Sequence, residues 1–120
     1  MKKILSILLL SVFCFLGIAV ASDAQRQISK YISNGTGAVT EVKASAGKVY
    51  GVTVLSTTTN GGYVTLYDST SSTVTGLTPK VEIGEATQYK TAIKDFPEGF
   101  DFYNGIYAQV GNAKVFVYYY

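Results

Sequence analysis

The chain has no histidine and no tryptophan, and its single cysteine, Cys14, and single methionine, Met1, both lie near the start. Without an imidazole or a thiol in the rest of the chain, the usual groups of catalytic triads, thiolate nucleophiles and zinc sites are absent. One cysteine cannot form an intramolecular disulfide. A domain built from this sequence must therefore be stabilised by packing, by a bound ion or by neighbouring subunits.

Residues 1–21 have the composition and order of a secretory signal peptide. Two lysines precede an apolar run from Ile4 to Leu16, and the small residues Ala19, Val20 and Ala21 follow. We expect cleavage between Ala21 and Ser22, which would place the mature protein in a secreted or cell-surface location. The alternative is an uncleaved membrane anchor, because 4–21 is close to the minimum length of a bilayer span.

Cleavage would also change the charge of the protein. The full chain carries ten basic and eight acidic residues, for a net charge of +2. Loss of Lys2 and Lys3 leaves eight residues of each sign. A neutral chain has no general electrostatic attraction to nucleic acid or to anionic lipid, so we expect neither a nucleic-acid partner nor stable membrane insertion after cleavage.

Two regions follow the predicted signal peptide. Residues 22–38 are polar and end in a glycine-rich stretch, which predicts a flexible N-terminal arm or linker. From Val39 to Tyr120 the sequence consists of short β-rich runs separated by turn residues, with strong turn signals at Asn60-Gly61 (a hairpin) and at 97–99. This pattern predicts an all-β fold: an antiparallel β-sandwich, jelly-roll-like, in a single domain over 39–120.

Carboxylates are the remaining groups that could support hydrolysis or bind a hard cation. A pair of them could hydrolyse glycosides, and the candidates are Asp68, Glu82, Glu85, Asp95, Glu98 and Asp101. The last three lie close together in sequence and could also bind calcium. A chain of this size has little room for a deep cleft, and the segment lacks the ligand density of a calcium loop. We therefore expect no enzymatic activity, no cofactor and no metal.

Tyrosine is unusually frequent, and all ten tyrosines lie after residue 21. Exposed aromatic rings can stack against sugars, so Tyr63, Tyr67, Tyr103 and Tyr107 could form a binding platform. The alternative is that the rings pack on a half-buried sheet with their hydroxyls in water, because tyrosine suits such positions.

The C-terminal segment, AKVFVYYY, has large side chains on both faces of its expected strand. Val115, Val117 and Tyr119 would point one way, and Phe116, Tyr118 and Tyr120 the other. Either this is a central strand whose outer face is covered by the arm, or the outer face contacts a neighbouring subunit. In the second case Phe116, Tyr118 and Tyr120 are the assembly interface.

Several stretches between 44 and 120 resemble a known class of proteins. GKVYGVTVLSTTTNGGYVTLYDST, PKVEIGEATQY and FYNGIYAQVGNAKVFVYY are similar to small phage and prophage β-sandwich proteins of the virion surface. This resemblance implies a structural role. Together with the C-terminal strand, it predicts an exported, non-enzymatic structural protein that acts through protein–protein contacts, as a subunit of a filament, coat or virion-like assembly. The partner would be a second copy or another surface protein. The alternative is a secreted carbohydrate-binding module with tyrosine platforms.

Overall fold

The computed structural model describes residues 27–33 and 36–120, so the predicted signal peptide lies outside the described residues. The described chain forms eight strands: β1 (Ile28–Ile32), β2 (Thr36–Lys43), β3 (Gly47–Ser56), β4 (Gly62–Asp68), β5 (Val81–Glu85), β6 (Thr91–Phe102), β7 (Ile106–Gly111) and β8 (Ala113–Tyr119). Within these described ranges, no helix is long and apolar enough to cross a bilayer.

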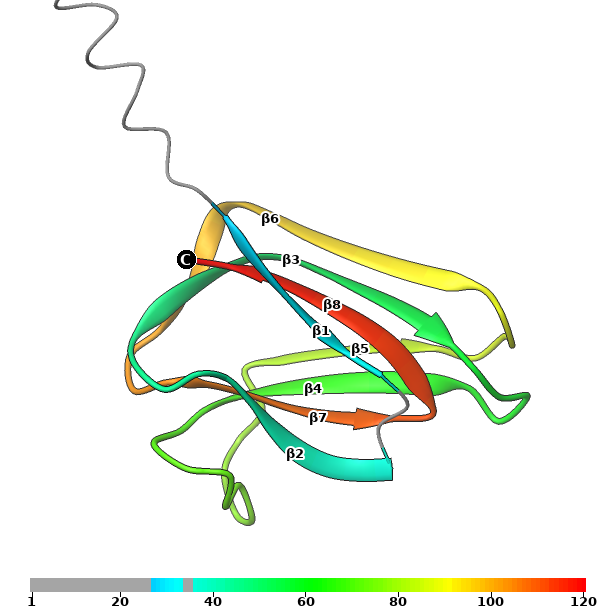
Figure 1. The fold of residues 1–120 in the computed structure, drawn as a ribbon, viewed down its shortest axis with the longest axis horizontal. Coiled ribbons are helices and arrows are strands. Elements are labelled where there is room, and N and C mark those ends of the chain that lie inside the picture. Colours follow the sequence, from blue (N-terminus) through cyan, green and yellow to red (C-terminus); the bar gives the residue numbers. More distant parts are fainter. Residues whose placement is uncertain (1–26, 34–35) are drawn as a thin grey trace, which may run out of the picture.

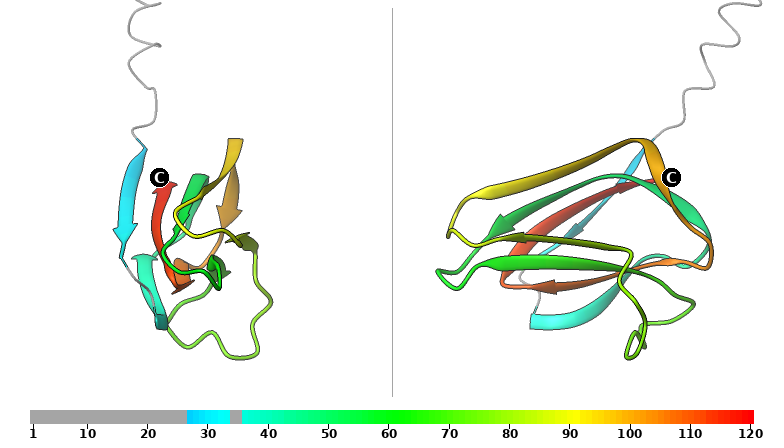
Figure 2. Two further views of the ribbon diagram at one scale, coloured as in Figure 1. Left: turned by 90° about the vertical axis from the view of Figure 1, so that its right-hand side faces the viewer. Right: turned by 180° about the vertical axis from the view of Figure 1, so that it is seen from behind.

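The strands form two antiparallel four-stranded sheets that pack face to face (Figure 1). One sheet has the order β1-β8-β3-β6 and the other the order β2-β7-β4-β5. The two layers are also visible from behind (Figure 2, right), with β6 and β3 in one layer and β4 and β7 in the other. This order is that of an eight-stranded jelly roll. The predicted fold class is therefore confirmed.

Most strand pairs join distant parts of the sequence. Among the described strands, β4 and β5 are the only pair that is consecutive in sequence and also hydrogen-bonded to each other. The turn at Asn60-Gly61 exists, and Gly61 has a φ of +83°. However, β3 and β4, which flank this turn, belong to different sheets. The hairpin expected there is wrong, and the turn instead carries the chain across the sandwich.

The core lies between the sheets and is built from alternating residues of the central strands. Its fully buried side chains include those of Val52, Val54, Val64, Leu66, Ile106, Val110, Val115 and Val117, each 0% exposed. Burial of one such aliphatic side chain stabilises the fold by about 1.5–3 kcal/mol. The period-2 pattern seen in the sequence is thus the pattern that separates core from surface.

The segment expected to be a flexible arm contains β1 and the start of β2 in its described part. Strand β1 pairs along its whole length with β8, from Ile28 opposite Tyr119 to Ile32 opposite Val115. Its side chains are exposed except for that of Ile32. Backbone pairing therefore holds β1 more than apolar burial does, which explains why hydrophobic patterning failed to identify it. Among the described residues, the sandwich begins at Ile28.

The turn expected at 97–99 is a bulge within one long strand, β6. Val49 of β3 pairs with Phe100, and Gly51 pairs with Asp95. Residues 96–99 of β6 are therefore opposite a single residue of β3, the one between Val49 and Gly51. Pro97 lies in this interruption, where its missing N–H is tolerated. Gly99 has a φ of +76°, which favours glycine.

Candidate functional site

The outer face of the β1-β8-β3-β6 sheet carries a row of side chains that crosses all four strands, and three of the four are large and apolar. Its members are directly opposite one another on successive strands: Tyr31, Phe116, Thr53 and Ile93. Tyr31, Phe116 and Ile93 are 47%, 40% and 66% exposed. We call this row, together with Tyr118, the aromatic face.

The rings of the aromatic face contact one another. The centroids of Tyr31 and Phe116 are 4.8 Å apart with an interplanar angle of 35°. Those of Phe116 and Tyr118 are 6.4 Å apart and nearly parallel, at 18°. Tyr118 lies opposite Gly51, where an added Cβ would be 3.5 Å from the tyrosine ring. The missing side chain at this glycine leaves room for the ring on the sheet.

Two opposite charges border the apolar row. On one side of the apolar row, Asp95 pairs with Gly51, which in turn pairs with Tyr118. On the other side, Lys114 pairs with Leu55. Both residues are exposed. Neither forms an ion pair with another residue in the described part of the chain. The aromatic face is therefore an apolar band with a negative border and a positive border.

Strand β8 lies between β1 and β3, so it is an internal strand. Val115 and Val117 point into the core, whereas Phe116 and Tyr120 are 40% and 48% exposed and Tyr118 is half-buried. Tyr120 exchanges backbone hydrogen bonds with Lys48, of 2.9 and 3.1 Å. The described part of the predicted arm does not cover the outer face of β8, because β1 lies beside β8 in the same sheet.

Three of the four tyrosines considered for sugar binding lie on the outer face of the other sheet, β2-β7-β4-β5. Tyr107 is only 4% exposed, and its hydroxyl donates a 3.0 Å hydrogen bond to Oε2 of Glu41. Desolvation, and then the hydrogen bond and charge of Glu41, raise the pKa of Tyr107. The Tyr67 hydroxyl donates to Oε1 of Gln109 at 3.3 Å. Both hydroxyls therefore form hydrogen bonds within this sheet. Tyr63, by contrast, is 39% exposed.

The fourth tyrosine, Tyr103, lies apart from the other three, in the turn between β6 and β7. It is 72% exposed, and Nζ of Lys80 lies 4.8 Å from its ring centroid. Asp68 holds this turn: its carboxylate accepts the backbone N–H groups of Tyr103 at 2.9 Å, Asn104 at 2.7 Å and Gly105 at 3.4 Å. Burial alone would raise the pKa of Asp68, but these donors outweigh it and lower the pKa. Asp68 is thus a structural carboxylate.

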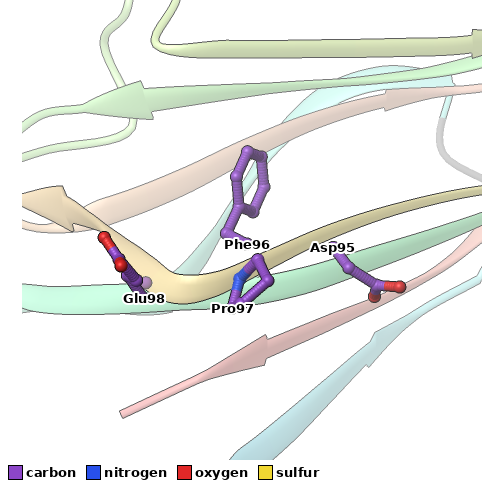
Figure 3. Close-up of a pocket in the computed structure, with 5 residues that line it drawn as sticks. Asp95, Phe96, Pro97 and Glu98 are labelled. Atoms are coloured by element: carbon purple, nitrogen blue, oxygen red, sulfur yellow. The ribbon is translucent and has the colours of Figure 1, made fainter.

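The acidic residues of β6 are not gathered into a site. A shallow hollow lies at the bulge, lined by residues 95–99 (Figure 3). The side chains of Asp95 and Glu98 point away from each other on either side of Phe96 and Pro97. Asp101 instead forms a 3.4 Å ion pair with Lys48. Across 27–33 and 36–120, no group of three or more acidic, histidine or cysteine side chains could hold a metal ion.

Sequence reasoning identified Phe116, Tyr118 and Tyr120 as candidates for an interface. The first two belong to the aromatic face, Tyr120 lies beside Lys43 and Lys48, and Tyr31 and Ile93 were missed. These two residues lie on edge strands, far from β8 in sequence, and only the jelly-roll strand order brings them into one row. No protein-family model, curated protein or solved structure matches this chain.

Proposed function

We propose that this is an exported, non-enzymatic structural protein that acts through protein–protein contacts, as a subunit of a filament, coat or virion-like surface assembly. The observation that carries this proposal is the aromatic face. Three large side chains of one row, those of Tyr31, Phe116 and Ile93, are each at least 40% exposed. A contiguous apolar band of this kind on a sheet is typical of an interaction surface.

The partner that this surface fits best is a second copy of the same chain. In a symmetric contact, each copy presents the same patch to the other, so the patch must complement itself. A twofold axis along the apolar row would place the Lys114 border of one copy over the Asp95 border of the other. The rows of Tyr31, Phe116 and Ile93 would then bury one another at the centre. Opposite charges at the rim favour this register over alternatives.

The residues available for chemistry favour the same function class. The chain after residue 21 has no imidazole and no thiol, and Asp68, whose side chain is 11% exposed, holds a turn. A structural protein needs none of these groups. The predicted signal peptide and the resemblance to virion-surface sandwiches support export and assembly, respectively, as parts of the proposal.

The test is the mass of the protein as a function of its concentration. Analytical ultracentrifugation of the wild type should reveal self-association. A variant with Ile93→Lys and Phe116→Lys should be monomeric at the same concentrations, because it places four like charges in one contact. Both positions are on the solvent side of the sheet, so circular dichroism should show that the sandwich remains folded.

Two further variants make the test specific. Leu77→Lys adds a charge at an apolar residue that is 42% exposed in the loop between β4 and β5, and should leave association unchanged. Val117→Lys places a charge at a position that is 0% exposed and should unfold the protein. A wild type that stays monomeric at millimolar concentration, or a double variant that associates like the wild type, would refute the proposal.

A further inference from the structure

Tyr63 is held flat on the outer face of the β2-β7-β4-β5 sheet by glycines. Its neighbours on the two adjacent strands are Gly111 of β7 and Gly84 of β5. A Cβ at Gly111 would overlap the Tyr63 ring, so the ring lies directly across the glycine backbone. The hydroxyl reaches toward Gly37, where an added Cβ would be 3.7 Å away. The other side of the ring is left toward solvent.

The exposed ring borders a shallow hollow of about 390 Å³ where β4 begins and β5 ends. It is lined by one aromatic residue, four small residues and three polar residues: Tyr63; Gly61, Gly62, Gly84 and Ala86; Asn60, Glu85 and Asn112. The small residues leave the ring and the polar groups accessible.

The polar groups around the ring retain hydrogen-bonding capacity. The side chains of Asn60 and Asn112 bond to no other residue of the described chain. Glu85 accepts the Thr87 backbone N–H at 2.8 Å through Oε1, which leaves Oε2 as an acceptor. The two amides therefore offer both donors and acceptors in the lining of the hollow, whereas Glu85 alternates with Gly84 along β5 and so lies on the other face of the sheet from Tyr63.

We propose that this hollow binds a neutral sugar ring of an oligosaccharide, stacked on Tyr63. A pyranose has one apolar C–H face and a rim of hydroxyls that both donate and accept. The face matches the tyrosine ring, and the rim matches the amides of Asn60 and Asn112. Anionic ligands fit poorly, because the lining contains a carboxylate and no cationic side chain.

The geometry also selects Tyr63 among the aromatic residues. Tyr107 is covered, and the Tyr67 hydroxyl is bonded within the sheet. Tyr103 is exposed but faces the ammonium of Lys80. The proposed sugar site lies on the opposite sheet from the aromatic face, so it does not depend on self-association. A subunit of a surface assembly could carry both surfaces at once.

The experiment is a titration of the ¹⁵N-labelled protein with three neutral oligosaccharides: cellohexaose, xylohexaose and chitohexaose. We expect at least one of them to shift the side-chain amide signals of Asn60 and Asn112. Its affinity should fall about tenfold or more in Tyr63→Ala, because the stacking surface is lost. Tyr103→Ala is the matched control, an exposed tyrosine outside the hollow, and should bind like the wild type.

A second variant blocks the site without removing the tyrosine. At Gly84, which lines the hollow, an added Cβ meets nothing closer than a backbone oxygen at 3.7 Å, so Gly84→Leu should fold normally and fill part of the hollow. Its binding should be abolished. The proposal is overturned if none of the three oligosaccharides shifts these signals at 10 mM, or if Tyr63→Ala and Gly84→Leu bind as tightly as the wild type. Tetramethylammonium is a cationic probe, and binding of it alone would also overturn the proposal.

Discussion

Phe116 on β8 lies directly opposite Tyr31 on β1, and their ring centroids are 4.8 Å apart. The two residues come from opposite ends of the described chain. Strand β1 buries almost no side chain except that of Ile32. The contact between these rings is therefore one of the few side-chain interactions that attach β1 to the sandwich.

A double-mutant cycle measures this contact. Tyr31→Ala and Phe116→Ala should each lower the free energy of unfolding slightly, and the double variant should lose less than the sum. We expect a coupling free energy of about 0.5–1.5 kcal/mol, the usual value for a tilted aromatic pair. Urea unfolding of dilute, monomeric protein gives the four values. Strict additivity would show that the rings are neighbours without a favourable interaction.

Asp68→Asn should destabilise the protein by about 1.5–3 kcal/mol at neutral pH, because hydrogen bonds to a charged acceptor are the stronger ones. The amide group of asparagine would face backbone donors at 103–105. Urea unfolding of the two proteins checks the difference. Asp101→Asn is the control: its ion pair with Lys48 is half exposed, so the loss should stay below about 1 kcal/mol.

The same substitution gives a pH dependence with a defined sign. The pKa of Asp68 is lower in the folded protein than its ordinary value of 3.8. The carboxylate therefore stabilises the fold above pH 3.8, and this contribution disappears as the pH falls through the lower, folded value. Wild type and Asp68→Asn should converge in stability under acid conditions. A constant difference down to pH 2 would contradict the assignment.

Tyr107 should ionise above its ordinary pKa of 10.0, first because it is desolvated and then because Glu41 is close. An alkaline absorbance titration should separate it from the exposed tyrosines. Glu41→Gln should lower its pKa but not fully restore the ordinary value, since desolvation remains. A folded pKa that is raised means that stability is lost as the pH rises through it, so the wild type should weaken above pH 10. Tyr107→Phe should lack this part of the alkaline loss.

Alternation along β3, β4, β7 and β8 was sufficient to predict the sandwich and the faces of the C-terminal strand. In β8 buried residues alternate with more exposed ones, and Val115 and Val117 follow that rule, whereas in β3 the alternation changes phase at the irregularity between Val49 and Gly51, so that Val52 and Val54 join Val49 in the core. Local signals could not predict which strands pair. Asn60-Gly61 has the same turn chemistry in a hairpin as in a crossover between sheets, because both need a residue with positive φ.

The rest of the aromatic face was beyond local reasoning for a related physical reason. Tyr31 and Ile93 become neighbours of Phe116 and Thr53 only through long-range pairing, which depends on the whole strand order. Strand β1 itself has no apolar pattern strong enough to predict it. The hollow at Tyr63 likewise depends on Gly111 and Gly84. These two glycines become neighbours of Tyr63 only because β7 and β5 flank β4.

The last prediction concerns the protection of β8 by β1. All five residues of β1 pair with β8, and β6 lies at the opposite edge of the same sheet. A chain that begins at residue 34 should leave β8 as an edge strand with open backbone groups and an apolar outer face. Such an edge promotes pairing with other chains. We therefore expect faster hydrogen exchange at Val115 and Val117 and more light scattering on heating.

A chain that begins at Ile28 keeps β1 and is the control, and it should behave like the longer protein. If the chain without β1 retains full protection at β8 and does not aggregate, β1 is dispensable and the edge is protected in another way.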